Sequence, residues 1–259
     1  MALQRRDPEA IAAALPADAF IADEAAFGAV AQRAFAAAAN GDIVTVGVRP
    51  SRPETGYGYL EPGEPIAEDV LRVRRFVEKP NAARAHELVT SGHFWNAGLF
   101  FFRANVLLNA IEAHLPPLAK MLAGCADAAA AGREQAWIDE QYPKLTKDSI
   151  DFGVMEKLSS GISVVPGDFG WDDVGSWGAA WSLTPHDAQG NALEARNVVV
   201  DTSGCHVRAP EGKLVALLGV RDLVVIDTPN ALLVMPRERA QDVRRIVDVL
   251  TERKDDDVL

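Results

Sequence analysis

An acid and a base stand side by side at the end of an apolar run in "RFVEKP", residues 75–80. Residues 73–77 have the composition of a strand, and Pro80 ends it because proline has no N–H for a strand ladder. One interpretation is that Glu78 and Lys79 form a solvated ion pair. The other is that they lie at the carboxyl end of a strand in an α/β sheet, where ligands bind in open sheets.

Four other stretches carry polar residues beside glycine or proline. They are "LPAD" at 15–18, "RPETGYGYLE" at 52–61, "FWNAG" at 94–98 and "GWDDVGSW" at 170–177. Each has a structural alternative: Asp18 can be a loop acid, Asp173 can cap a helix that starts at the next residue, and Asn96 can bond to the backbone. Gly56 and Gly58 can serve a turn. Taken singly, the stretches favour these structural roles, whereas their joint occurrence favours a ligand site.

The composition is typical of a folded protein with one large domain and a smaller one. The chain has 259 residues, of which 48% are hydrophobic and 24% are charged. Its formal net charge of −11 opposes binding along the backbone of DNA or RNA, so we expect no nucleic-acid partner. Cys125 and Cys205 lie far apart in the sequence, which fits a reducing compartment and argues against a structural zinc site.

The N-terminal segment has two arginines ahead of an alanine-rich stretch, which raises the question of a signal peptide. Acids and a proline interrupt that stretch at Asp7, Glu9, Pro16 and Asp18. No later segment approaches the ~20 apolar residues that span a membrane. We therefore expect a cytoplasmic protein without a membrane partner.

Strand and helix patterns alternate over the first 187 residues. We expect helices over 24–39, 81–89, 104–114 and 148–158, and strands over 42–48, 73–77, 97–102 and 162–168. Asp23 and Asn81 have the residue type and the position of N-caps. This alternation predicts a doubly wound, Rossmann-like α/β domain over 1–187, with a mostly parallel sheet covered by helices.

The pattern changes near residue 190. Short strands separated by turns such as "DTSG", "PEGK" and "DTPN" predict a small all-β, β-helix-like unit over 188–259, closed by a helix over about 237–251. Cys205 and His206 are interpreted as packing residues rather than metal ligands. The unit is interpreted as a packing or dimerisation module, so a homodimer is the expected assembly.

The strings "PAD", "RPETGYGYLE", "FVEKP", "WNAGLFFF", "SIDFGVMEK" and "WDDVGSW" occur in this order. Together they resemble the signatures of the mannose-1-phosphate guanylyltransferases, within the sugar nucleotidyltransferases. "VEKP" and "PAD" are widespread among enzymes that act on sugar 1-phosphates, but the combination of "RPETGYGY", "SIDFGVMEK" and "WDDVGSW" looks like the mannose enzyme. The resemblance, which runs from about Leu15 to the final helix, implies that mannose 1-phosphate attacks the α-phosphorus of GTP, giving GDP-mannose and pyrophosphate.

The resemblance also implies a catalytic set. Asp18 and Asp173 match the family's Mg²⁺-binding acids, and Mg²⁺ prefers one or two carboxylates together with substrate oxygens. Asp172 occupies a more variable position in the family. Lys79 completes the expected catalytic set, because it would offset the charge of the sugar phosphate.

On the sugar side, the resemblance implies that Glu78 accepts hydrogen bonds from sugar hydroxyls. The glycine-rich loop would let the backbone approach the sugar, and Asn96 would bond to a hydroxyl. The expected substrate-binding residues are Gly56, Tyr57, Gly58, Glu78, Lys79 and Asn96.

The sequence departs from the family pattern near its start. The family opens with a strand and a nucleotide-binding loop of the type G-G-x-G-T-R-L, and the sequence contains no such segment. Ala19 and Ala97 replace the family's usual histidine and serine, and the "AIAAAL" segment before Asp18 is poor in β-branched residues for a central strand. We therefore expect an N-terminally truncated domain. The alternatives are a non-catalytic relative that binds sugar phosphate or pairs with a full-length subunit, and a nucleotidyltransferase for another sugar 1-phosphate.

Overall fold

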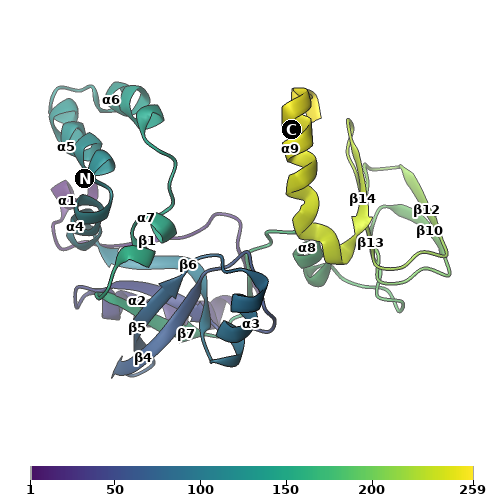
Figure 1. Cartoon of the computed structure of the whole chain (residues 1–259), viewed down its shortest axis with the longest axis horizontal. Helices are drawn as coiled ribbons and strands as arrows, with labels where there is room; N and C mark the ends of the chain where they lie inside the picture. Colours follow the sequence, from purple (N-terminus) through teal and green to yellow (C-terminus); the bar gives the residue numbers. More distant parts are fainter. Residues whose placement is uncertain (1, 259) are drawn as a thin grey trace. The chain divides into compact units, whose positions relative to one another are not determined.

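The computed structural model describes residues 2–258, and the chain forms two compact units, Met1–Trp171 and Asp172–Leu259 (Figure 1). The boundary falls within the two-residue strand β8 (Trp171–Asp172). The domain boundary expected from the sequence, after residue 187, stays a prediction. Within the described residues, every helix is too short or too polar to cross a membrane.

Unit 1 is built on a six-stranded sheet with the strand order β1-β6-β3-β7-β5-β4, in which β4 also pairs with β6. The strands are β1 (Ile11–Ala14), β3 (Ile43–Val48), β4 (Tyr59–Ala67), β5 (Val70–Val77), β6 (Phe94–Arg103) and β7 (Ile162–Gly167). Among these described strands only the pair β3–β7 is parallel. The expectation of a mostly parallel sheet is therefore wrong, because the sheet is mixed and largely antiparallel.

A short connection explains the antiparallel pairing of β4 with β5. β4 and β5 are joined through Glu68 and Asp69, and Asp69 has the left-handed φ of 53° that a tight turn requires. A two-residue connection can join only antiparallel strands, since a parallel pair needs a crossover of about a dozen residues. The alanine-rich β1 stands at the end of the strand order, where its low β propensity matters less than in the centre.

The sheet separates two cores because successive residues of a strand point to opposite faces. On β6, Leu99 packs into one core together with α2 (Glu24–Ala38), whereas Phe100 packs into the other. Asp23 caps α2 as the sequence predicts, and its side chain accepts a hydrogen bond of 2.9 Å from a backbone N–H of the first turn.

The remaining elements of unit 1 surround the sheet. They are α1 (Ala2–Arg6), β2 (Phe20–Ile21), α3 (Ala82–Thr90), α4 (Ala104–His114), α5 (Pro116–Ala130), α6 (Glu134–Gln141), η1 (Tyr142–Lys144), α7 (Ile150–Gly153) and η2 (Met155–Lys157). The predictions of α3 with its Asn81 cap and of α4 are confirmed. The continuous helix expected over 148–158 is wrong, because complete burial of the consecutive residues Val154 and Met155 takes precedence over helix continuity.

Unit 2 is a small β unit with a terminal helix, as the sequence predicts. Its strands are β9 (Ala192–Glu194), β10 (Arg196–Val200), β11 (His206–Arg208), β12 (Leu214–Leu218), β13 (Leu223–Asp227) and β14 (Leu232–Pro236). The strands β9, β11 and β13 pair in parallel, and so do β10 and β12, while β14 is antiparallel to β13. Parallel pairing between successive turns of the chain is typical of a β-helix. Cys205 and His206 are buried in this unit.

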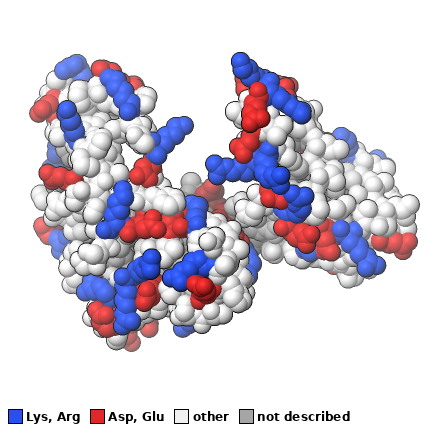
Figure 2. All heavy atoms as spheres, viewed as in Figure 1, with Lys and Arg blue, Asp and Glu red and all other residues white. Residues whose placement is uncertain are grey.

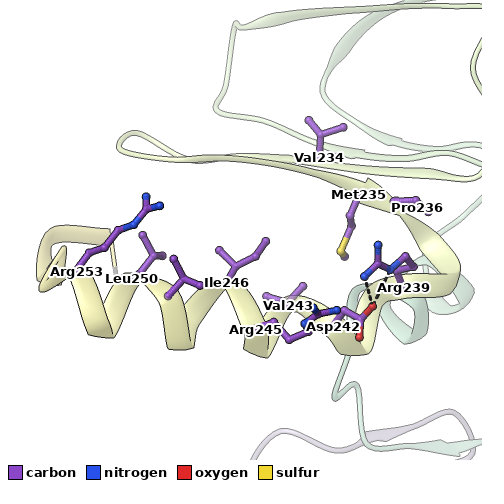
Figure 3. A pocket seen from close by; sticks show the side chains of 11 residues that line it. Val234, Met235, Pro236, Arg239, Asp242, Val243, Arg245, Ile246, Leu250 and Arg253 are labelled. Atoms are coloured by element: carbon purple, nitrogen blue, oxygen red, sulfur yellow. Dashed lines mark hydrogen bonds and ion pairs between the residues drawn. The ribbon is translucent and has the colours of Figure 1, made fainter.

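The helical elements of unit 2 are α8 (Trp177–Leu183), η3 (Arg237–Asp242), α9 (Val243–Arg253) and η4 (Asp256–Val258). A groove of about 540 Å³ lies between α9 and β14 (Figure 3). Ile246 and Leu250 contribute apolar side chains to it, and Arg239 beside it pairs with Asp242. Every residue of the described helix α9 keeps part of its surface exposed.

Candidate functional site

The ends of three strands of unit 1 meet around Glu78 and Lys79. In the β4–β5 hairpin Tyr59 lies opposite Val77, and Tyr59 also lies opposite Trp95 on β6. The register therefore brings together the residue before β4, the residues after β5 and the first residues of β6. Thr45 of β3 and Asp151 of α7 (Ile150–Gly153) join this group through hydrogen bonds to Asn96. We name the whole group the strand-end cluster, and it consists of Thr45, Gly58, Glu78, Lys79, Asn96 and Asp151.

Gly58 is packed so closely that a side chain does not fit. A Cβ at this position would lie 2.6 Å from Glu78 Oε2 and 3.4 Å from Asn96 Cβ. The Gly58 carbonyl accepts a hydrogen bond of 2.8 Å from the Asn96 N–H. The absence of a side chain at Gly58 thus lets the backbone before β4 lie against the Glu78 carboxylate.

Glu78 and Lys79 form an ion pair with very different exposure at its two ends. Lys79 Nζ lies 2.6 Å from Glu78 Oε1, and the exposed fraction is 54% for the Lys79 side chain but 4% for that of Glu78. Lys79 also has a left-handed φ of 43°, which is uncommon for a residue with a side chain. Its ammonium group lies 5.8 Å from the centre of the Phe152 ring. The acid is therefore fixed in the interior, while the base reaches solvent.

Asn96 is the middle member of a chain of hydrogen bonds. Thr45 Oγ1 donates to Asn96 Oδ1 over 2.6 Å, and Asn96 Nδ2 donates to Asp151 Oδ1 over 3.1 Å. Thr45 and Asn96 are buried. Both ends of the amide thus have protein partners, and its expected contact with a sugar hydroxyl stays a prediction.

Burial raises the pKa of both carboxyl groups in the cluster. For Glu78, loss of hydration is the main cause of the raised pKa; the hydrogen bond from Lys79 opposes it and the negative charge of Asp151 adds to it. The pKa of Asp151 is raised mainly by loss of hydration, against the effects of its backbone hydrogen bond, of the Lys79 charge and of Asn96. Perturbed carboxyls beside a lysine are typical of functional sites.

Sequence reasoning quoted "SIDFGVMEK" but assigned no role to its acids. Asp151 on α7 joins the cluster, and Glu156 on η2 accepts a hydrogen bond of 3.4 Å from the Glu78 N–H. In a continuous helix, residues five apart point in different directions. Only the break between α7 and η2 lets both acids face the end of β5. The sequence does not indicate a functional role for Thr45, since this residue lies inside the apolar run "DIVTVGV".

The loop that leads into β4 is fixed at several points. The buried Tyr59 hydroxyl accepts a hydrogen bond of 2.8 Å from the Glu54 N–H and donates one of 2.9 Å to the Glu54 carbonyl. Glu54 Oε1 in turn accepts from the Gly56 N–H over 3.1 Å. The Tyr57 ring packs edge-on against Trp95, with 5.1 Å between ring centres. The predicted residues Gly56 and Tyr57 therefore belong to a well-anchored loop.

The two predicted Mg²⁺-binding acids lie in different units. Asp18 is exposed in the loop between β1 and β2 of unit 1. Asp173 belongs to unit 2, where its Oδ1 accepts a hydrogen bond of 3.1 Å from the Gly175 N–H. Among the residues that the structure describes, no set of three or more His, Cys, Asp and Glu side chains could hold a metal ion. The carboxylate oxygens of Asp18 and Asp173 are nevertheless of the type that Mg²⁺ prefers, since this ion takes one or two carboxylates and completes its shell with water and phosphate oxygens.

The acids of "GWDDVGSW" shape a turn rather than a helix start. Asp172 Oδ1 accepts a hydrogen bond of 2.8 Å from the N–H of Val174, whose φ of 52° is left-handed. The following helix, α8, is capped by Ser176. The interpretation of Asp173 as the cap of a helix that starts at Val174 is therefore wrong.

Charges of both signs are interspersed over the face of the molecule that Figure 2 shows. That face carries no extended surface of one sign. We therefore expect recognition of a charged ligand to depend on local groups such as those of the strand-end cluster.

Two family models match the chain. The model described as "Nucleotidyl transferase" matches residues 1–190, and the model described as "MannoseP isomerase/GMP-like beta-helix domain" matches residues 195–250. The first match includes every residue of the strand-end cluster. The second covers most of the parallel strands of unit 2 and most of α9.

Two curated relatives align with nearly the whole chain. A putative mannose-1-phosphate guanylyltransferase of Vibrio cholerae is 37% identical over 95% of this chain and 53% of its own length. A mannose-1-phosphate guanylyltransferase of Escherichia coli K12 is 37% identical over 96% of this chain and 53% of its own length. The chain therefore spans about half the length of these relatives.

Solved structures agree with these matches. A structure described as mannose-1-phosphate geranyltransferase from Thermus thermophilus is 38% identical with a TM-score of 0.83, and the match covers 96% of this chain and 72% of that one. A mannose-6-phosphate isomerase from Helicobacter pylori is 27% identical with a TM-score of 0.53, and the match covers 64% of this chain and 66% of that one.

Proposed function

Because the chain belongs to the nucleotidyl transferase family, we propose that it takes part in the transfer of a guanylyl group from GTP to mannose 1-phosphate, giving GDP-mannose and pyrophosphate. Relatives named for this activity are 37% identical over nearly the whole chain, which supports the proposal. The observation that carries it is the strand-end cluster, where a buried carboxylate and a solvent-reaching lysine stand beside a stretch of backbone without a side chain.

Lys79 and Glu78 are assigned to the two ends of the sugar phosphate. Lys79 binds the phosphate, because its ammonium group is the exposed member of the ion pair. Glu78 accepts hydrogen bonds from sugar hydroxyls, because a buried carboxylate with a fixed position can discriminate hydroxyl configuration. Without a side chain, Gly58 lets backbone groups lie close to the Glu78 carboxylate and to the sugar that it would bind.

The reaction proposed is an in-line displacement at phosphorus. A phosphate oxygen of mannose 1-phosphate forms a bond to the α-phosphorus of GTP while the bond to the pyrophosphate leaving group breaks. Positioning and neutralisation of charge supply most of the rate in such a transfer, so Lys79 acts by holding the attacking phosphate.

Asp18 and Asp173 are each assigned to Mg²⁺ binding because they match the Mg²⁺-binding acids of the family that the sequence resembles. The ion would offset the charge that gathers on the transferring group. Each residue offers a hard carboxylate oxygen, and Asp173 is held in a turn by its bond to the Gly175 N–H. Asp172 is kept as the weaker ligand candidate, because the family that the sequence resembles is more variable at this position.

The first experiment measures pyrophosphate release by the 259-residue chain with Mg²⁺, mannose 1-phosphate and GTP. We expect turnover that needs both substrates and that is lost in Asp173→Ala. Parallel reactions replace GTP by the other nucleoside triphosphates and mannose 1-phosphate by glucose 1-phosphate. Equal turnover with glucose 1-phosphate would instead favour a nucleotidyltransferase for another sugar.

Isothermal titration with mannose 1-phosphate distinguishes the proposed enzyme from a non-catalytic relative that only binds sugar phosphate. Binding without any turnover, from a chain that circular dichroism shows to be folded, would favour a non-catalytic sugar-phosphate-binding protein. A folded chain that neither binds mannose 1-phosphate nor releases pyrophosphate would contradict the proposed function.

A further inference from the structure

The amide of Asn96 is held in one orientation by its neighbours. Thr45 donates to the amide oxygen over 2.6 Å, and the amide nitrogen donates to Asp151 over 3.1 Å. An ionised carboxylate can only accept hydrogen bonds, so the nitrogen is the end that must face Asp151. A rotation of the amide by 180° would turn its oxygen toward the Asp151 carboxylate and lose that hydrogen bond, whereas the Thr45 hydroxyl can either donate or accept. Asp151 therefore sets the orientation of the amide, and the hydrogen bond from Thr45 holds the amide at its other end.

Asp151 lies next to Glu78 around the same lysine. The negative charge of Asp151 acts on Glu78, and the positive charge of Lys79 acts on both acids. The Lys79 ammonium also lies 5.8 Å from the ring of Phe152, the residue after Asp151. A Cβ built on Gly58 would meet both Glu78 and Asn96, which places the backbone without a side chain beside the same groups.

We propose that Asp151 is a second sugar-recognising carboxylate, which Thr45 and Asn96 hold in position beside Glu78. This inference rests on the proposed function. Two neighbouring carboxylates can accept hydrogen bonds from two neighbouring hydroxyls, and such a pair recognises the relative configuration of those hydroxyls. Thr45 and Asn96 are then positioning residues, while Glu78 and Asp151 contact the sugar.

The test is isothermal titration of the full chain with mannose 1-phosphate and with glucose 1-phosphate, which differ in configuration at carbon 2. We expect the wild type to prefer mannose 1-phosphate. Asp151→Asn keeps the size of the side chain but replaces one acceptor oxygen by a donor. It should weaken mannose 1-phosphate binding by about tenfold or more and reduce the preference between the two sugars.

Thr45→Val removes the hydroxyl at nearly constant volume and leaves the Asn96 amide held only at its nitrogen, by Asp151. We expect a loss of about three- to tenfold in affinity and a reduced preference, while Thr45→Ser restores both. Ser163→Ala is the matched control, because Ser163 is buried on β7 and its hydroxyl has no hydrogen-bond partner among the described residues. Ser163→Ala should bind as the wild type does.

The two proposals fail in different ways. If the wild type binds mannose 1-phosphate and folded Asp151→Asn binds both sugars as the wild type does, Asp151 has no recognition role and the inference is wrong. If Thr45→Val lowers thermal stability without changing the preference, the hydrogen-bonded chain has a structural role only. If the folded wild type binds neither sugar phosphate, the proposed function fails and the inference fails with it.

Discussion

Two loops of the molecule each place a glycine against a carboxylate, but in different surroundings. A Cβ on Gly58 would lie 2.6 Å from Glu78 Oε2, and a Cβ on Gly175 would lie 2.5 Å from Asp173 Oδ2. Glu78 is buried, and a Cβ on Gly58 would also meet the Phe76 ring. In contrast, Asp173 is partly exposed and Gly175 is exposed.

The two loops differ in how freely their carboxylate side chains can move. The Glu78 side chain is only 4% exposed and its carboxylate is paired with Lys79, so its position suits the recognition of hydroxyls with fixed geometry. The Asp173 carboxylate is held from its own turn and borders solvent, so it can adjust to a cation that arrives with its own phosphate oxygens. A short distance between a glycine and a carboxylate therefore does not by itself indicate how strongly a substitution of the glycine affects the site.

The largest effect should come from Gly58→Ala. The added methyl group must displace the Glu78 carboxylate or the backbone, and overpacking of this kind costs about 1–3 kcal/mol. We expect mannose 1-phosphate affinity to fall by about tenfold or more, because loss of about 1.4 kcal/mol corresponds to tenfold. Isothermal titration and urea unfolding measure the two effects.

Gly28→Ala is the control for that substitution. Gly28 lies in α2, and a Cβ there would meet nothing within 4 Å. Alanine in a helix interior should stabilise the chain by about 0.5–1 kcal/mol without changing affinity. Unchanged affinity in Gly58→Ala would show that the Glu78 carboxylate is free to move after all.

A smaller effect should appear in the pH dependence of Glu78→Gln. The pKa of Glu78 is raised above its ordinary value of 4.5, so the folded chain keeps this proton at pH values where the unfolded chain has lost it. Stability from this group is therefore present at low pH and is lost as the pH rises through the folded pKa. Glutamine does not ionise and escapes this loss.

Urea unfolding of the wild type and of Glu78→Gln at several pH values from about 4 to 8 tests the direction of this pH dependence. The free energy of unfolding of Glu78→Gln, relative to wild type, should rise with increasing pH. A relative stability that stays constant or falls with pH would show that the Lys79 ion pair outweighs the loss of hydration.

The smallest effect should come from Gly175→Ala. The contact is as short as that of Gly58, but the Asp173 carboxylate can swing toward solvent. We expect a change in the free energy of unfolding within about 0.5 kcal/mol, as for surface substitutions generally. Urea unfolding measures it, and a loss as large as that of Gly58→Ala would remove the distinction between the two loops.

Local signals were sufficient for several elements of unit 1. Asp23 and Asn81 are N-caps whose side chains act within their own helices, so residue type and position predict them. The predicted β-helix-like unit also depends on short-range turns. In contrast, β4 was hidden, because Pro62 and Pro65 lie within it and the pairing with β5 shifts register at both prolines.

The candidate site was predictable only as separate pieces. Glu78 and Asn96 could be proposed from their motifs. That they lie close together follows only from the pairing of β4 with both β5 and β6. Asp151 joins them through a hydrogen bond that spans 55 positions in the sequence. No local pattern contains such a contact, and the break between α7 and η2 that permits it comes from core packing.

The left-handed backbone of Lys79 has a consequence for protein engineering. Glycine or asparagine adopts this conformation more easily, but Lys79→Gly or Lys79→Asn would also leave the buried Glu78 carboxylate without its ion-pair partner. Either change would remove the cation that we assign to the sugar phosphate. Backbone preference and ion pairing therefore oppose each other at this position, and a variant library should be selected for ligand binding and stability together.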